Sequence, residues 1–133
     1  PKQGVSLTTR YSFDANDNLI AIKQPEGNTV QRVYNERDLV HTITQGFNST
    51  DASTRTLSYD ANGNLIETVD AVDNSGDGKG DVETLSYDAF DRLIEHHDAE
   101  GNRLVYQYDA NGNRVRESRY GSSGISGQTQ EIW

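Results

Sequence analysis

One acidic, glycine-rich segment, residues 73–81, holds the residues whose types and spacing most clearly point to chemistry. Oxygen donors occur at alternate positions, in the side chains of Asp73, Ser75, Asp77 and Asp81 and in the backbone carbonyl of Lys79. Alternate oxygen donors on a tightly curved loop are typical of calcium sites of the EF-hand type. Thr84 stands where such sites carry a bidentate glutamate at position 12. The sequence therefore predicts weak calcium binding, and a flexible acidic loop without metal is the alternative.

The other candidate groups argue against catalysis. The three histidines are His41, His96 and His97, and the last two are neighbours on a predicted strand, where consecutive side chains point to opposite faces. Carboxylate pairs such as Asp14 and Asp17 recur in the repeat described below, and an active site would not be copied into every turn. No serine lies in a nucleophile-elbow pattern. The sequence predicts no catalytic residue, no required cofactor and no enzymatic activity.

A short sequence motif, here called the phrase, occurs five times and sets the positions of these groups along the chain. Each copy begins with an aromatic residue followed by Asp or Asn, and the copies start at Phe13, Tyr34, Tyr59, Tyr87 and Tyr108. The steps between them are 21, 25, 28 and 21 residues, and the longest step contains residues 73–81. Recurrence at this period indicates a repeat architecture, in which each unit is stabilised by its stacked neighbours.

Each phrase predicts a tight hairpin turn. The fourth residue after the aromatic is Asp17, Asp38, Gly63, Asp91 or Gly112, and these residue types enter the left-handed backbone conformation at least cost. We therefore predict a positive φ at all five positions. The Asp or Asn that follows the aromatic can accept a hydrogen bond from the backbone N–H two residues on. A second turn, at residues 26–28 and 100–102, returns the chain to the next aromatic.

The segments between the turns are predicted strands, because apolar and aromatic residues such as Leu85 and Tyr87 alternate with period two. The predicted fold class is all-β, with antiparallel β-hairpin repeats that form a twisted ribbon. We assign residues 1–133 to a single fragment with repeats at 8–30, 31–55, 56–83, 84–104 and 105–120, and with 121–133 entering a next repeat. Leu, Ile, Val and Phe make up only about 20% of the chain, which predicts a thin core. The chain lacks methionine, so we expect it to be part of a longer protein.

Composition excludes several classes of partner. The net charge of −9 argues against nucleic acid, which requires a basic surface. No apolar run is long enough to span a bilayer, and no signal peptide is visible. The absence of cysteine removes disulfides and zinc–cysteine sites, and it is consistent with a secreted or cell-surface repeat protein.

The phrase Tyr-Asp-Ala-Asn-Gly-Asn-Leu-Ile, which begins at Tyr59, resembles the tyrosine-aspartate (YD) repeat of the RHS family. This family includes bacterial polymorphic toxins, shell proteins of insecticidal toxin complexes, wall-associated proteins and teneurins. The resemblance extends over about residues 8–120, with Phe13 and Asn35 as departures from the pattern. It implies a segment of a spiral YD-repeat shell that closes, in complete proteins, around a C-terminal toxic or cleaved segment. The self-cleaving motif and the toxin domain of such proteins have no counterpart in these residues.

Three functions remain open at this stage. The preferred one is a structural scaffold in a secreted or surface protein that encapsulates or displays a C-terminal toxin or effector, and the family resemblance implies a bacterial protein. Its partners would be further repeats of the same protein and the enclosed segment. The second is a cell-surface binding module for a glycan or receptor. The third is a self-assembling unit that pairs through exposed edge strands.

Overall fold

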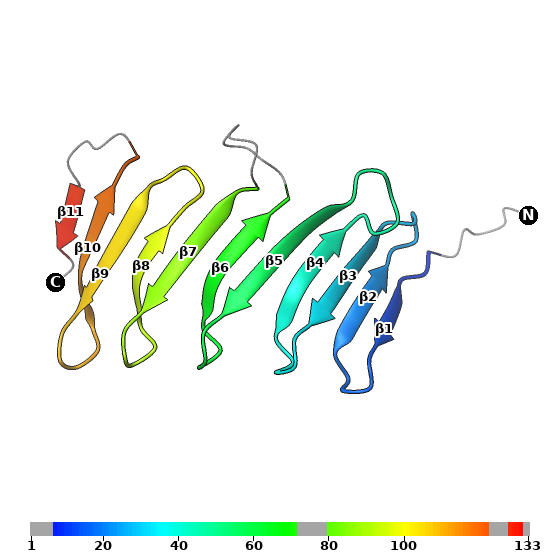
Figure 1. The fold of residues 1–133 in the computed structure, drawn as a ribbon, viewed down its shortest axis with the longest axis horizontal. Coiled ribbons are helices and arrows are strands. Elements are labelled where there is room, and N and C mark those ends of the chain that lie inside the picture. The colour runs from blue at the N-terminus through cyan, green and yellow to red at the C-terminus, as the bar shows by residue number, and fades with distance from the viewer. Residues whose placement is uncertain (1–6, 72–79, 123–127, 132–133) are drawn as a thin grey trace, which may run out of the picture. The chain divides into compact units, whose positions relative to one another are not determined.

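The computed structural model describes residues 7–71, 80–122 and 128–131 (Figure 1). All regular secondary structure in these residues is β-strand, and consecutive strands pair antiparallel. The predicted all-β, antiparallel hairpin fold is therefore confirmed. Within the described residues there is no helix that could cross a membrane.

The chain forms two compact units, Pro1–Thr56 and Leu57–Trp133. In each unit the strands lie in the sheet in the order of the sequence. The first unit contains β1 (Arg10–Phe13), β2 (Leu19–Lys23), β3 (Thr29–Tyr34), β4 (Val40–Gln45) and the first part of β5 (Ser53–Tyr59). The second contains the end of β5, β6 (Leu65–Asp70), β7 (Val82–Tyr87), β8 (Leu93–His97), β9 (Arg103–Tyr108), β10 (Arg114–Tyr120) and β11 (Gln128–Glu131).

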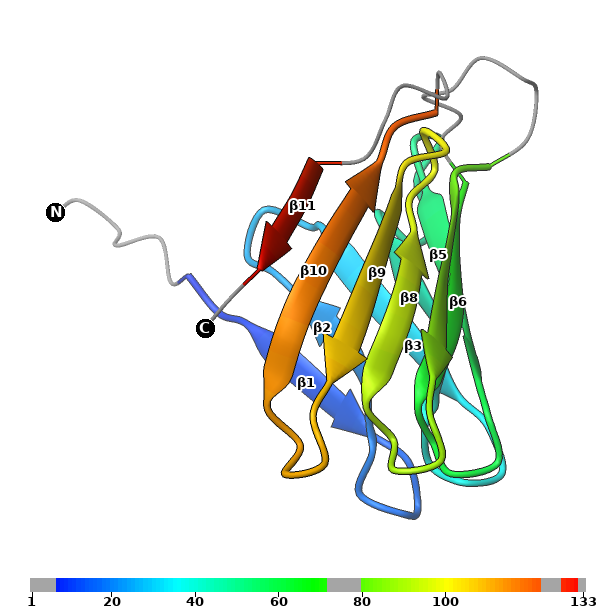
Figure 2. The ribbon, with the colours of Figure 1, turned by 90° about the vertical axis from the view of Figure 1, so that its left-hand side faces the viewer.

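Within each unit the tight turns lie along one edge of the sheet and the return turns along the opposite edge (Figure 1). Figure 2 shows β8, β9 and β10 of the second unit side by side, with this alternation of turns. We number the tight turns 1 to 5, at residues 14–18, 35–39, 60–64, 88–92 and 109–113. Strands that alternate in direction along a sheet bring successive tight turns next to one another.

A shift in strand register accompanies four of these turns. It lies between Ser12 and Phe13 at turn 1, and the corresponding shifts occur at turns 2, 4 and 5. In each case the strand that follows the turn carries one extra residue without a register partner, at Ile20, His41, Ile94 or Val115. A β-bulge therefore recurs at the same place after these four turns.

The sheet has little core of its own. Among the described residues no hydrophobic side chain is fully buried, and the only buried residues are Glu117 and Ser118. Most leucines, isoleucines and tyrosines of the strands are half-buried. This agrees with the predicted thin core, and it means that each hairpin depends strongly on its neighbours in the sheet.

Candidate functional site

The five predicted left-handed positions have positive φ, as expected. Asp17, Asp38 and Asp91 have φ values of 63°, 56° and 59°, and Gly63 and Gly112 have φ values of 89° and 87°. The backbone N–H of each donates to the carbonyl oxygen three residues earlier, at 3.0–3.2 Å. The predicted left-handed conformation is therefore confirmed at all five positions.

The first residue of each turn binds the backbone of the turn through its side chain. In turn 3, Oδ1 of Asp60 accepts hydrogen bonds from the backbone N–H groups of Asn62, at 2.9 Å, and Asn64, at 2.8 Å. Its Oδ2 accepts from Nδ2 of Asn64 at 3.1 Å. The backbone bonds recur, at 2.8–3.1 Å, at Asp14, Asn35, Asp88, Asp98 and Asp109. The bond two residues on was predicted, and the bond four residues on was missed.

Asp98 shows that a return turn uses the same chemistry. Its Oδ1 accepts from the N–H groups of Glu100 and Asn102, and Gly101 between them has a φ of 81°. We had predicted only a looser turn at residues 100–102. The available signal was the spacing of four residues between Asp98 and Asn102, which is also the spacing of Asp60 and Asn64.

These hydrogen bonds favour the ionised carboxylates. The side-chain amide of Asn113, and then the backbone N–H groups of turn 5, lower the pKa of Asp109 below its usual value. The Arg92 side chain is the main cause of the lowered pKa of Asp88, and the backbone bond from Asn18 is the main cause at Asp14. A lowered carboxyl pKa in the folded state stabilises the fold above the pKa of the unfolded chain. This contribution is lost as the pH falls through the folded-state pKa.

Replacement of Asp109 with asparagine tests this linkage. At about pH 6 we expect Asp109→Asn to be less stable than the wild type, because a charged acceptor is lost. The difference should narrow between about pH 5 and pH 2, where the wild-type carboxylate itself becomes protonated. Urea unfolding midpoints at the two ends of this range provide the measurement. Asp17→Asn is the control, since no hydrogen bond to its carboxylate occurs in the described part of the chain. If the difference in urea unfolding midpoint between Asp109→Asn and the wild type stayed constant with pH, the lowered pKa of Asp109 would not contribute to stability.

The tyrosine that precedes a turn reaches back to the preceding hairpin. The hydroxyl of Tyr87 donates to the carbonyl oxygen of Leu65 at 2.9 Å, and Leu65 directly follows turn 3. Tyr34 and Tyr108 make the equivalent bonds to Leu19 and Leu93, at 3.0 Å and 2.7 Å. We had predicted packing for the tyrosines, and the role of their hydroxyl groups was missed.

Turns 4 and 5 are joined by a cation. The guanidinium of Arg92 lies over the ring of Tyr108, 4.6 Å from its centroid, and over the ring of Phe90, at 5.2 Å. Its Nη2 also lies 2.7 Å from Oδ2 of Asp88, so the arginine links its own turn to the start of the next one. Cation–π contacts at partly exposed sites stabilise modestly.

His96 and His97 contact different carboxylates. Nε2 of His96 lies 3.3 Å from Glu83, whereas Nε2 of His97 lies 2.6 Å from Glu95 on its own strand. His41 lies on β4, in the other unit. The described residues contain no group of three or more His, Asp or Glu side chains that could hold a metal ion. The ion pairs of His96 with Glu83 and of His97 with Glu95 join partly exposed side chains, so they contribute little to stability.

A second charged cluster surrounds the buried Glu117 on β10. Its Oε1 lies 2.7 Å from Nη2 of Arg119, and its Oε2 lies 3.7 Å from Nη1 of Arg114. Arg114 also lies over the ring of Tyr106, 5.0 Å from its centroid. The buried carboxylate is thus paired with two arginines of its own strand, whose heads reach solvent, and Arg114 also links β10 to β9 through the ring of Tyr106.

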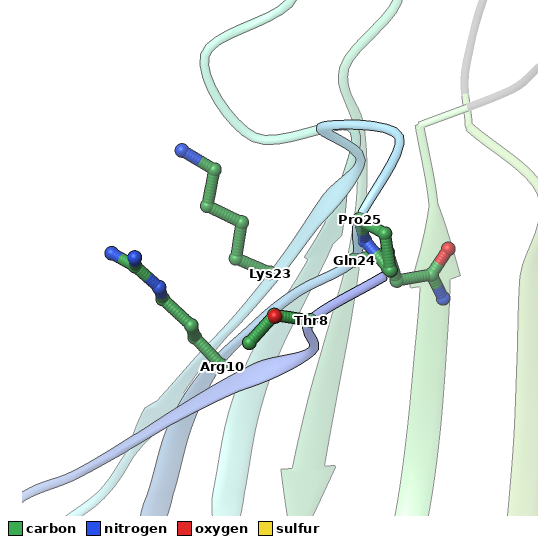
Figure 3. A pocket seen from close by; sticks show the side chains of 5 residues that line it. All are labelled: Thr8, Arg10, Lys23, Gln24 and Pro25. Carbon is green, nitrogen blue, oxygen red and sulfur yellow. The ribbon is translucent and has the colours of Figure 1, made fainter. Parts of the chain in front are cut away.

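One open recess lies on the first unit, lined by Thr8, Arg10, Lys23, Gln24 and Pro25 (Figure 3). Arg10 and Lys23 are register partners on β1 and β2, and Figure 3 shows both side chains extending to the same side. Among the described residues that line the recess there is no carboxylate and no histidine.

Most of the proposed calcium ligands, Asp73, Ser75, Asp77 and Lys79, lie outside the described residues. The described ligand is Asp81, whose carbonyl oxygen accepts a hydrogen bond from the N–H of Asp70 at 2.8 Å. Calcium binding stays a prediction. We expect millimolar calcium to raise the melting temperature relative to chelator, and Asp77→Ala to abolish the shift. An identical melting temperature with calcium and with chelator would leave the segment as a linker.

Residues 2–78 match the family described as Teneurin YD-shell, and residues 77–123 match the RHS Repeat family. Among curated proteins, none matches the sequence significantly.

Solved structures share the fold at low sequence identity. The Photorhabdus luminescens Tc holotoxin pore superposes with a TM-score of 0.79 at 13% identity, over 94% of this chain. The crystal structure of TcdB2-TccC3 has a TM-score of 0.79 at 15% identity, also over 94% of the chain. A related crystal structure, TcdB2-TccC3-TEV, has a TM-score of 0.71 at 20% identity, over 86% of the chain. The present chain spans only 6–7% of the length of these chains.

Proposed function

This chain belongs to the RHS/YD-repeat family, and from that premise we propose that it forms part of the wall of a shell that encloses a C-terminal toxin or effector segment. The family and the shared fold support a structural scaffold role. The enclosed segment and the further repeats of the same protein are the partners that the proposal requires. Both partners are those that the YD-repeat resemblance implies, a shell of repeats closed around a C-terminal segment.

The observation that carries the proposal is the way in which each hairpin is attached to the one before it. The bonds from Tyr34 to Leu19, from Tyr87 to Leu65 and from Tyr108 to Leu93 repeat one geometry between successive hairpins. No described hydrophobic side chain is fully buried, so the sheet derives its stability along its length and not from a local core. We call each of these tyrosine hydrogen bonds, which attaches one hairpin to the hairpin before it, a joint. A sheet that is extended by repeating the same joint is suited to form a wall.

The proposal places the protein outside the cell or at its surface, in a bacterium. The acidic, cysteine-free composition is compatible with that location. We further propose that the chain has no catalytic activity of its own. Purified protein should show no hydrolase or transferase turnover, and turnover that disappears on replacement of His41, His96 or His97 would contradict this.

Limited proteolysis of the intact protein tests enclosure. If the wall shields the C-terminal segment, that segment should resist protease in the wild type and in Asp17→Gly, which leaves the joints between hairpins in place. Tyr87→Ala, which removes one joint, should speed cleavage of the enclosed segment several-fold. Equal cleavage rates in the three proteins would overturn enclosure. The scaffold role would then be limited to display of the C-terminal segment.

A further inference from the structure

Successive tight turns are linked by side chains as well as by strands. In the second unit, Nδ2 of Asn62 and Nδ2 of Asn64 in turn 3 both donate to Oδ1 of Asp91 in turn 4, at 2.8 Å and 2.7 Å. In the first unit, Asn16 and Asn18 donate in the same way to Asp38, at 3.0 Å and 2.8 Å. One carboxylate oxygen is therefore held by two amides of the preceding turn, in two independent copies.

The accepting aspartate occupies a costly backbone conformation. Asp38 and Asp91 have φ values of 56° and 59°, where glycine would be unstrained. Turns 3 and 5 carry Gly63 and Gly112 at this position. The turns that precede those two in the sequence have no asparagine at their third and fifth residues. Aspartate thus replaces glycine where two asparagine donors stand in the preceding turn.

Turn 5 repeats the donor side of this arrangement. Nδ2 of Asn113 donates to Oδ2 of Asp109 at 3.0 Å, as Asn64 does to Asp60 at 3.1 Å. Among the described residues, the side-chain amide of Asn111 donates to no partner and that of Asn113 donates only to its own turn. Asn113 is exposed, whereas Asn64 is half-buried and donates to Asp91 of the neighbouring turn.

We propose that turn 5 is a carboxylate-binding site, whose ligand is the left-handed aspartate of a hairpin turn that docks beside it. Two amide N–H groups converging on one oxygen provide charge-assisted hydrogen bonds. The docking hairpin is the one that continues from β11 in the same polypeptide. β11 pairs antiparallel with β10, so it runs back toward the edge on which turn 5 lies, and it already occupies the place that a strand from a second copy would need. The pair of asparagines and the aspartate together determine which hairpins are compatible neighbours.

The contact that already exists between the asparagines of turn 3 and Asp91 of turn 4 provides the first test. Asn62→Ala removes one donor and keeps the backbone bonds, and Asp91→Gly removes the acceptor while relieving the left-handed strain. A double-mutant cycle on the full chain, followed by urea unfolding, should give a coupling of about three- to tenfold in the folding equilibrium constant. The control pairs Asn62→Ala with Asp17→Gly, which lies in the other unit and should be additive. If the effects of Asn62→Ala and Asp91→Gly on the free energy of unfolding were additive, the proposal that the asparagines of one turn recognise the aspartate of the next would be wrong.

The donor pair at turn 5 is tested by extending the chain after Trp133 with a duplicate of residues 87–97. The added tyrosine then continues the register of β10 and β11 opposite Asn113, as Tyr87 lies opposite Asn64. The added turn then carries an aspartate at its left-handed position, and the matched variant carries glycine there. Side-chain amide resonances of Asn111 and Asn113 should shift, and their hydrogen exchange should slow several-fold, only with aspartate. Asn111→Ala should remove the difference in stability between the two extended chains. Equal shifts with aspartate and glycine, or no shift with either, would overturn the assignment of turn 5.

Discussion

Replacing Tyr87 with alanine should lower the free energy of unfolding by about 2 kcal/mol, roughly half the cost of truncating a fully buried aromatic residue. Tyr87 is half-buried at the end of β7, and its hydroxyl group donates to the carbonyl oxygen of Leu65. Burial, with the carboxylate of Asp60 nearby, raises the pKa of the hydroxyl, so it stays protonated as a donor at neutral pH. The truncation therefore removes both apolar contact and the hydrogen bond to the preceding hairpin.

Tyr87→Phe separates these two contributions. It keeps the ring and removes the hydroxyl, so the expected loss is about 0.5–1.5 kcal/mol. Urea unfolding monitored by circular dichroism measures both variants. Hydrogen exchange at turns 3 and 4 should rise more than exchange at distant strands, because the joint is local. If Phe and Ala at this position were equally destabilising, the ring would have no packing role. If Phe were neutral, the bond to Leu65 would not stabilise the joint.

Replacing Gly112 with valine should destabilise by about 1–2 kcal/mol, because a β-branched side chain in the left-handed region brings its Cβ too close to the backbone. Gly112 has a φ of 87°, and its N–H donates to the carbonyl oxygen of Asp109, so the turn cannot relax without losing that bond. Thermal and urea unfolding of the full chain would measure the effect.

Gly112→Asp is the matched control. Aspartate is found in this conformation at three of the five turns of the chain, and it should cost much less than valine. A Cβ atom on residue 112 would lie 3.8 Å from Nη1 of Arg92, so the new carboxylate would lie near a guanidinium. Equal losses with Asp and Val would show that any side chain is excluded by crowding. No loss with Val would contradict the requirement for a left-handed residue.

Much of the fold followed from short-range chemistry. The turn at Asn62 and Gly63 is determined by residues within five positions of one another, and the alternation of Leu85 and Tyr87 by a period of two. Both patterns act locally, so they are readable without knowing what lies beside each hairpin. The repetition of the phrase added the antiparallel order of the strands, because each tight turn reverses the chain.

The joints between hairpins depended on the tertiary structure. Asn62 and Asp91 are 29 residues apart, and the Tyr87 hydroxyl reaches a carbonyl 22 residues earlier. No local pattern shows which atoms meet, because their positions depend on the register of neighbouring strands and on the bulge that follows four of the turns. The sequence by itself determined the hairpins, their left-handed residues and the thin core. Only the tertiary structure decided that an aspartate in one turn is held by two asparagines of the turn before it, since that contact exists only when the sheet brings the turns side by side.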